Sequence, residues 1–197
     1  MDGPHTPAHR SSRAGFTLVE LVVVLAIAAI LVTGVVPAMA ELVNRNRQAS
    51  HVNHVVASLH LARTEAITRG DDTVLCPSLD DRTCADTFRW DRGWLVFADL
   101  DRDAARDPGE PLLRVVQGLR GTRIFTSTGR RRITFRSSGA RGGMGSSGGS
   151  NATFTFCRSE SAQESAAVVL SNVGRARTVR PAPAPHGRKC SATTTGY

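Results

Sequence analysis

The feature that most constrains this chain is an apolar run near its N-terminus. Leu21 to Ala40 is a stretch of 20 residues without a charged side chain. At about 1.5 Å of rise per residue, a helix of that length spans the roughly 30 Å hydrocarbon layer of a membrane. Arg10 and Arg13 precede the run, and basic residues beside a membrane span stay on the cytoplasmic side. The sequence therefore predicts one pass through a membrane, with the rest of the chain outside the cytoplasm.

Glu20, directly before the run, separates three interpretations of this segment. A cleavable secretory signal would use the A-x-A pattern of Ala38-Met39-Ala40, but its apolar stretch of about 7–15 residues is shorter than this run. A plain membrane anchor accounts for the length and leaves Glu20 unexplained, because a carboxylate in hydrocarbon costs at least a few kcal/mol. The third interpretation is a membrane span that also uses the carboxylate.

The residues around Glu20 favour the third interpretation. Residues 15–20 read Gly-Phe-Thr-Leu-Val-Glu and, with the apolar run and Pro37, resemble the class III signal of type IV pilins and pseudopilins. The resemblance implies cleavage by a prepilin peptidase after Gly15 and N-methylation of Phe16. It also implies that Glu20 helps to neutralise a buried N-terminal amine during assembly, which gives the carboxylate a partner. Pro37 stands where many pilins bend or locally melt their helix, since proline removes a helical hydrogen bond.

After Pro37 the apolar pattern becomes one-sided. Apolar residues recur at steps of three and four from Val52 to Ala66, which predicts a helix with one buried face. Gly70 is a natural residue just beyond a helix C-terminus, so we expect the helix to end near Arg69. Short β-rich runs separated by Gly, Asp, Ser or Pro follow, and they predict an antiparallel β domain. The predicted strands are Thr73–Cys76, Trp94–Ala98, Leu112–Gln117, Arg132–Arg136, Thr153–Cys157, Ala167–Leu170 and Arg175–Val179.

The processing implied by the resemblance, together with the composition, divides the chain into five segments. They are a leader at 1–15, a transmembrane and assembly half of the helix at 16–40, an amphipathic half at 41–70, a β-rich domain at 71–180 and a proline-rich tail at 181–197. Within the β-rich domain, residues 137–151 are glycine-rich, which predicts a flexible loop. Trp90 and Trp94 are expected in the core of that domain rather than in contact with a ligand.

The four cysteines are expected to form disulfides, because the domain that carries them is exported. The sequence allows three pairings. We favour Cys76–Cys84, which closes a short polar loop, together with Cys157–Cys190, which ties the tail to a strand.

The order of segments resembles the FimT/GspH family of minor pilins and H-type pseudopilins, from about Gly15 to Arg180. The stretches "CPSLDDRTC", "WDRGWLVFADLDRD", "GEPLLRV" and "VLSNVGRARTVR" carry this resemblance. It implies an α+β, pilin-like fold, in which a long N-terminal helix packs on a mostly antiparallel β domain. It also implies a location in the bacterial inner membrane and then in a pilus or pseudopilus, with other major and minor pilins, the prepilin peptidase and the membrane as partners. No cofactor and no enzymatic activity are expected.

The motif Gly174-Arg175-Ala176-Arg177 is the strongest candidate for a binding site. Residues 111–197 carry 14 Lys and Arg against 2 Asp and Glu, and alternate residues of a strand share a face about 7 Å apart. The motif matches the GRxR pattern associated with DNA binding in FimT-like pilins that serve natural transformation. We therefore predict sequence-independent, salt-dependent binding of double-stranded DNA to phosphates. The arginines that could extend this surface are Arg123, Arg130, Arg131, Arg132 and Arg180.

Three other interpretations of these arginines stay open. A charged edge strand also prevents aggregation without binding anything. An H-type pseudopilin of a type II secretion system would share the fold and bind no nucleic acid. A purely structural initiator of pilus assembly would make the arginines incidental.

Two further clusters contain residue types that bind metal ions. Asp99, Asp101, Asp103, Asp107 and Glu110 occupy positions 1, 3, 5, 9 and 12 of an EF-hand-like calcium loop. Ala104 replaces the glycine of that loop and neither flank is helical in pattern, so we favour an acidic hairpin loop without a metal. His51 and His54 lie three residues apart on the predicted helix, with no third ligand evident.

Overall fold

The computed structural model describes residues 15–127, 130–142, 151–157 and 166–180. Helix α1 (Leu18–Arg69) is continuous over 52 residues and ends directly before Gly70, as predicted. The chain divides at Arg45 into two compact units, so that the first part of α1 belongs to one unit and the second part to the other. The fold is α+β, as the sequence predicted.

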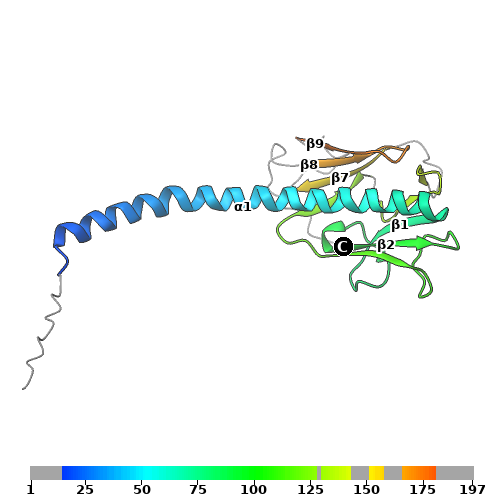
Figure 1. Ribbon diagram of the computed structural model, residues 1–197, viewed down its shortest axis with the longest axis horizontal. Coiled ribbons are helices and arrows are strands. Elements are labelled where there is room, and N and C mark those ends of the chain that lie inside the picture. Colours follow the sequence, from blue (N-terminus) through cyan, green and yellow to red (C-terminus); the bar gives the residue numbers. More distant parts are fainter. Residues whose placement is uncertain (1–14, 128–129, 143–150, 158–165, 181–197) are drawn as a thin grey trace, which may run out of the picture. The chain divides into compact units, whose positions relative to one another are not determined.

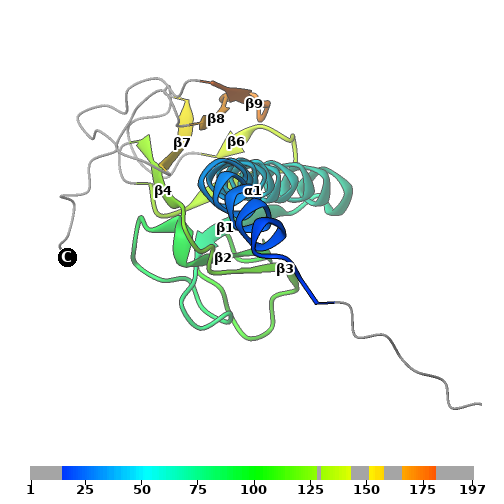
Figure 2. The ribbon, with the colours of Figure 1, turned by 90° about the vertical axis from the view of Figure 1, so that its left-hand side faces the viewer.

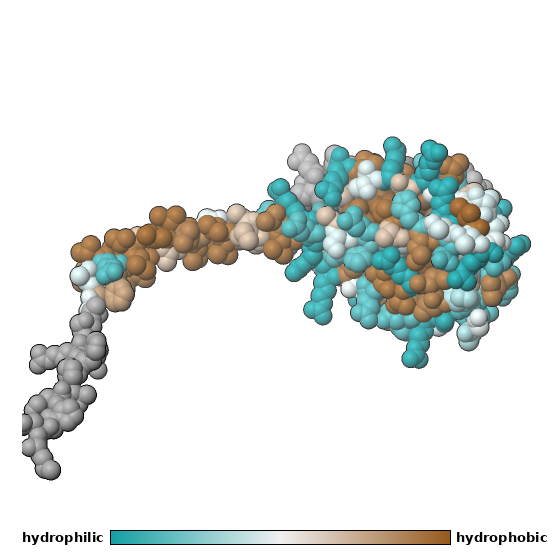
Figure 3. All heavy atoms as spheres, in the orientation of Figure 1, coloured by the Kyte–Doolittle hydropathy of each residue, from teal (hydrophilic) through white to brown (hydrophobic). Residues whose placement is uncertain are grey.

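The N-terminal unit contains the apolar part of α1. Thr17 Oγ1 accepts a hydrogen bond from the Glu20 N–H at 3.2 Å, which caps the first turn. Large apolar side chains are exposed along this part of the helix, and Figure 3 shows its apolar surface. The helix continues through Pro37. The local melting considered for this position is therefore not found, because a helix can tolerate one missing backbone hydrogen bond when the turns on both sides keep theirs.

In the C-terminal unit, the described strands form two antiparallel sheets. The first has the order β3-β2-β1-β5-β6 and consists of β1 (Asp72–Pro77), β2 (Gly93–Asp99), β3 (Leu112–Gln117), β5 (Ile133–Phe135) and β6 (Arg141–Gly142). The second has the order β4-β7-β8-β9 and consists of β4 (Arg123–Thr126), β7 (Ala152–Cys157), β8 (Ala166–Leu170) and β9 (Ala176–Val179). Figures 1 and 2 show the second part of α1 between the two sheets.

The main core lies where this part of α1 meets both sheets. The helix contributes Val52, Val55, Leu59, Ala62 and Ala66, which follow the spacing that predicted a buried face. Both tryptophans are only 1% exposed, which confirms their assignment to the core. Their indole N–H groups have hydrogen-bond partners, as burial requires. Trp90 donates to the carbonyl of Arg130 at 3.1 Å, and Trp94 donates to Ser58 Oγ at 3.0 Å.

A second, smaller core covers the opposite face of β1 and β2. It contains Val74, Cys76, Leu95, Phe97 and Ala104, with Cys84 packed against it. Both strands are therefore buried on both faces, which explains their continuous apolar sequences. The covering residues come from two loops, residues 76–84 (the disulfide loop) and residues 99–110 (the acidic loop).

Two strands were not predicted. β4 is four residues long, and its alternating pattern was too short to be recognised. β6 lies inside the segment that we expected to be a flexible glycine-rich loop, so that expectation is wrong for residues 137–142. They form a turn in which the Gly139 N–H donates to the Arg136 carbonyl at 2.7 Å, followed by pairing of β6 with β5. The rest of that segment, up to residue 150, lies outside the described residues.

Candidate functional site

The N-terminal segment presents the residues of the processing motif at the start of the helix. Gly15 and Phe16 precede α1, and the Phe16 side chain is 82% exposed. Glu20 lies in the first turn of α1. The most apolar 18-residue window of α1 has a mean hydropathy of 2.8 and none of it is buried, so by length and composition this helix is able to cross a membrane.

The arginine motif lies at an edge of the second sheet. β9 is its last strand and pairs only with β8, so the other side of β9 is a free edge within the described structure. Arg177 lies opposite Val169 in this pairing, and both Arg175 and Arg177 are exposed. β9 begins at Ala176, which corrects the prediction that Arg175 belongs to the strand. Arg175 instead ends the turn between β8 and β9, where its carbonyl accepts the Ser171 N–H at 2.9 Å.

Residues 171–175, the β8–β9 turn, are held by side chains from two other elements. Arg63 of α1 donates from Nη1 to the Gly174 carbonyl at 3.1 Å. Arg141 of β6 donates from its backbone N–H to the Asn172 carbonyl at 2.9 Å and from Nη2 to Asn172 Oδ1 at 2.8 Å. Neither arginine was predicted as a positioning residue, because neither lies near the motif in the sequence.

Gly174 is required by the same packing. Its φ angle is +78°, and a Cβ atom there would lie 2.3 Å from the Gly139 carbonyl oxygen. A side chain would therefore collide with backbone that cannot move away as a flexible side chain can. The glycine of the motif accordingly has a structural reason that is independent of any ligand.

The other basic candidates do not all join this edge. Arg123 lies in β4, at the opposite edge of the sheet from β9. Arg131 forms an ion pair with Asp86 at 2.6 Å. The Arg130 carbonyl accepts a hydrogen bond from Thr126 Oγ1 at 2.8 Å. Arg132 and Arg180 are exposed, the latter directly after β9. Arg175 and Arg177 are thus both exposed and two residues apart in the chain, whereas Arg123 lies at the other edge of the sheet and Arg131 is paired with Asp86.

One disulfide of the predicted pairing is present in the described residues. Cys76 and Cys84 are bonded, with their Cα atoms 5.5 Å apart. Asp80 closes the same loop, since it accepts hydrogen bonds from the backbone N–H groups of Thr83 and Arg82, and these bonds hold the pKa of its carboxyl below the ordinary value. Cys157 is also disulfide-bonded, and its predicted partner Cys190 lies outside the described residues.

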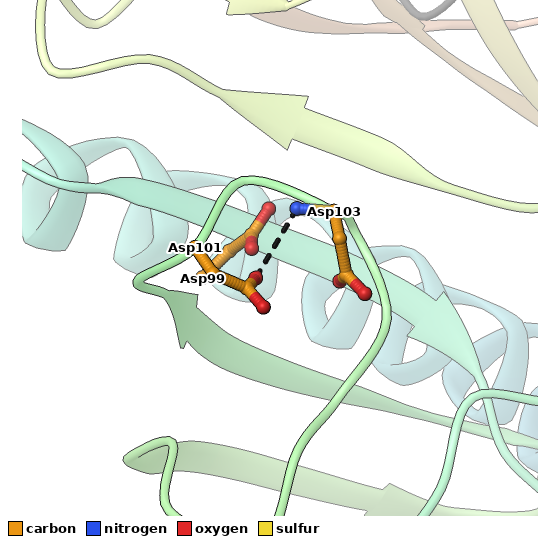
Figure 4. A group of neighbouring side chains, drawn as sticks. All are labelled: Asp99, Asp101 and Asp103. Atoms are coloured by element: carbon orange, nitrogen blue, oxygen red, sulfur yellow. Dashed lines mark hydrogen bonds between the residues drawn. The ribbon is translucent and has the colours of Figure 1, made fainter.

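The acidic loop connects β2 to β3 and gathers three carboxylates (Figure 4). Asp99 is 1% exposed, whereas Asp101 and Asp103 are exposed. Burial, followed by repulsion from Glu110 and Asp101, raises the pKa of Asp99 to about 6. Both Glu110 oxygens accept backbone N–H groups of the loop, from Leu100 at 2.8 Å and from Asp107 at 3.0 Å.

The histidine pair on α1 is divided between two environments. His51 is 7% exposed and its Nδ1 lies 2.9 Å from Thr122 Oγ1. Burial, with smaller contributions from His54 and Arg47, lowers the pKa of His51. Within the described residues, the metal-like grouping of side chains is the aspartate cluster and includes neither histidine.

Comparison with solved structures defines the class of fold. The type IV minor pilin FimU of Pseudomonas aeruginosa aligns with a TM-score of 0.56 at 20% identity over 75% of this chain and 97% of that chain. A second crystal form of the same pilin aligns with a TM-score of 0.53 at 19% identity, over 73% of this chain and 99% of that chain. The minor pseudopilin EpsH of the type 2 secretion system of Vibrio cholerae aligns with a TM-score of 0.46 at 15% identity, over 70% of this chain and 99% of that chain. The two alignments with FimU show that the fold is pilin-like.

Comparison with protein families places the chain more narrowly. Residues 51–174 match the family described as "Type II transport protein GspH", and residues 10–36 match the prokaryotic N-terminal methylation motif. Comparison with curated protein sequences gives no significant match. The chain belongs to the GspH family and has the methylation motif of pilins and pseudopilins, as the sequence resemblance predicted.

Proposed function

We propose that this chain is a minor pilin subunit that is anchored in the bacterial inner membrane by α1 and then assembles into a pilus through the same helix. The observation that supports this role is the exposed apolar surface of α1 from Leu18 to Val36. That surface needs lipid before assembly and neighbouring pilin helices afterwards. Prepilin peptidase cleaves after Gly15 and the new N-terminal Phe16 is methylated. Glu20 then pairs with an N-terminal amine in the assembled helices. The role is structural, and no reaction is assigned to it.

Within this role, we propose that Arg175 and Arg177 hold extracellular double-stranded DNA for uptake in natural transformation. Both side chains are exposed, and among the described strands β9 pairs with β8 alone. No described carboxylate lies within ion-pair distance of either guanidinium. Two guanidiniums that are two residues apart in the chain can contact successive phosphates, and arginine binds phosphate through a planar pair of donors. Arg180, Arg130 and Arg132 contribute weaker, nonspecific attraction.

The second candidate is an H-type minor pseudopilin of a type II secretion system. The description of the matching family as a type II transport protein favours it. In this role the fold, the membrane anchor and the processing are the same, and the arginines serve only to keep the edge of the sheet soluble. DNA binding therefore separates the two candidates.

The experiment is a fluorescence anisotropy titration of a labelled random-sequence DNA duplex with the full chain in a nonionic detergent. Each phosphate contact contributes a slope of about −0.9 to the dependence of log K on log salt. Two contacts therefore predict a slope near −1.8, or an affinity roughly 12-fold lower at about 200 mM than at about 50 mM salt. The Arg175→Ala/Arg177→Ala variant is expected to lose most of the binding and most of the slope.

The control removes two exposed arginines from another part of the chain, as Arg92→Ala/Arg120→Ala. It has the same net charge as the test variant and is expected to bind nearly as well as the unaltered chain. Equal losses of DNA affinity in both variants would show that DNA binding depends on net charge alone. If the unaltered chain binds no DNA at low salt, the pseudopilin role takes first place.

A further inference from the structure

The acidic loop, residues 99–110, holds three carboxylates at the spacing of ligands around one ion. Asp99 ends β2, and Asp101 and Asp103 follow at alternate positions. One oxygen from each of the three lies within 4.8 Å of the others. Oxygen ligands lie about 2.3–2.6 Å from a bound calcium ion, so two ligands on opposite sides are separated by roughly 5 Å. The three aspartates are thus close enough together to hold one ion without rearrangement of the loop (Figure 4).

One oxygen of Asp99 points independently to a missing ligand. The Asp99 side chain is buried at 1% exposure, and its Oδ2 accepts the Ala104 N–H at 3.1 Å. Its Oδ1 is buried and has no hydrogen-bond partner among the described residues. A buried carboxylate oxygen without a partner is costly, and the cost rises when further carboxylates stand beside it. A cation among the three aspartates would remove both costs.

The backbone of the loop adopts a left-handed turn at Ala104, although the sequence has no glycine there. Ala104, in place of the glycine of an EF-hand loop, has a φ angle of +59° and is 3% exposed. Its methyl group packs in the second core with Phe97, and that burial offsets the strain of a left-handed alanine. Glu110, at position 12, closes the loop through its two backbone hydrogen bonds. The alanine is therefore no objection to an ion site.

We propose that the acidic loop binds one calcium ion, with Asp99, Asp101 and Asp103 as carboxylate ligands. All three ligands are oxygens, which selects a hard cation rather than zinc or copper. Two of them are exposed, so water molecules complete the six to eight ligands that calcium takes. Magnesium demands a smaller and nearly ideal octahedron, which a loop open to solvent on one side does not impose. This proposal holds whether or not the chain binds DNA.

The test is a calcium titration of the full chain in detergent, after removal of divalent ions with a chelator. Isothermal titration calorimetry is expected to show one saturable site with Kd in the range of about 0.1–1 mM that is typical of extracellular calcium modules. Calcium is also expected to raise the unfolding temperature followed by fluorescence of the two buried tryptophans, and magnesium at the same concentration to raise it less. The absence of a saturable signal up to about 10 mM calcium, roughly ten times the weakest Kd in that range, would overturn the proposal.

The test variant is Asp101→Asn/Asp103→Asn. Both residues are exposed, and asparagine keeps an oxygen for the backbone bonds that each aspartate accepts in the loop. The variant is therefore expected to fold without calcium, with an unaltered circular dichroism spectrum, and to bind calcium at least about tenfold more weakly. The control Asp81→Asn/Asp86→Asn makes the same change in net charge outside the loop and is expected to bind as the unaltered chain does. Equal calcium affinity of the test variant and the unaltered chain would refute the assignment.

Discussion

Gly174→Ala tests whether the β8–β9 turn, which carries the arginine motif, packs closely against the turn that contains Gly139. At the φ angle of +78°, a residue other than glycine costs about 1–2 kcal/mol. The new Cβ atom would lie 2.3 Å from the Gly139 carbonyl oxygen, and forcing an atom into packed structure costs about 1–3 kcal/mol more. The two contributions predict that the free energy of unfolding falls by about 2–5 kcal/mol, which lowers the unfolding temperature of a domain of this size by roughly 5–15 °C.

Fluorescence of Trp90 and Trp94 measures this change directly, because both are buried in the core of the C-terminal unit. Gly109→Ala is the matched control, since nothing lies within 4 Å of a Cβ atom there and its φ angle is not in the left-handed region. It is expected to change the free energy of unfolding by less than about 1 kcal/mol. If Gly174→Ala were as stable as Gly109→Ala, the close contact of the two turns would be refuted.

Two further predictions concern the stability of the C-terminal unit. Cys76→Ser/Cys84→Ser removes a disulfide that closes a loop with a sequence separation of 8. Because the disulfide restricts the unfolded chain, its loss is expected to lower the free energy of unfolding by about 2.5 kcal/mol, measured by chemical denaturation. An unchanged denaturation midpoint would contradict this prediction. Burial lowers the pKa of His51 from 6.5, so the unfolded chain binds more protons than the folded chain below that pH, and stability falls as the pH drops from about 7. Between about pH 7.5 and 5.5, the unfolding temperature of the unaltered chain should therefore fall more steeply than that of His51→Asn. Opposing pKa shifts, such as that of Asp99, are present in both chains and cancel in this comparison. Parallel curves of unfolding temperature against pH would show that His51 does not contribute to the pH dependence of stability.

The helix and most strands were predictable because their signals are local. The spacing of Val52, Val55 and Leu59 defines a buried helix face, and Gly70 marks its end. β1 and β2 were recognisable as apolar runs, although the sequence did not show why both of their faces are buried. That burial depends on Ala104 and Cys84, which belong to loops that fold back over the sheet.

The parts that were not predicted depend on contacts between distant segments. β6 is two residues long and exists because it pairs with β5 and because Arg141 binds Asn172 of another turn. No local pattern in a glycine-rich stretch indicates such partners. The same reasoning applies to Ala104, where the loop adopts a left-handed turn without the glycine that sequence patterns require.

The arginine surface shows how far composition predicts a binding site. Counting charges identified arginines that could extend the motif into a broader basic surface, but a count does not locate the partners of each arginine. Asp86 neutralises Arg131 across 45 positions of sequence, and Arg123 lies at the opposite edge of the sheet from Arg177. Arg177 was predicted correctly as a residue of the strand, whereas the expectation that Arg175 lies on the same strand is wrong, because β9 begins at Ala176.

The central claim, that this chain is processed and assembled as a pilin, is tested most directly by the mass of its N-terminus after expression in a bacterium with a prepilin peptidase. The account predicts a mature chain that begins at Phe16 and carries one additional methyl group on its N-terminal amine. A Gly15→Ala variant provides the control and should retain its leader. A mature chain that still begins at Met1, or one that begins at Glu41 after cleavage beyond Ala40, would contradict the account.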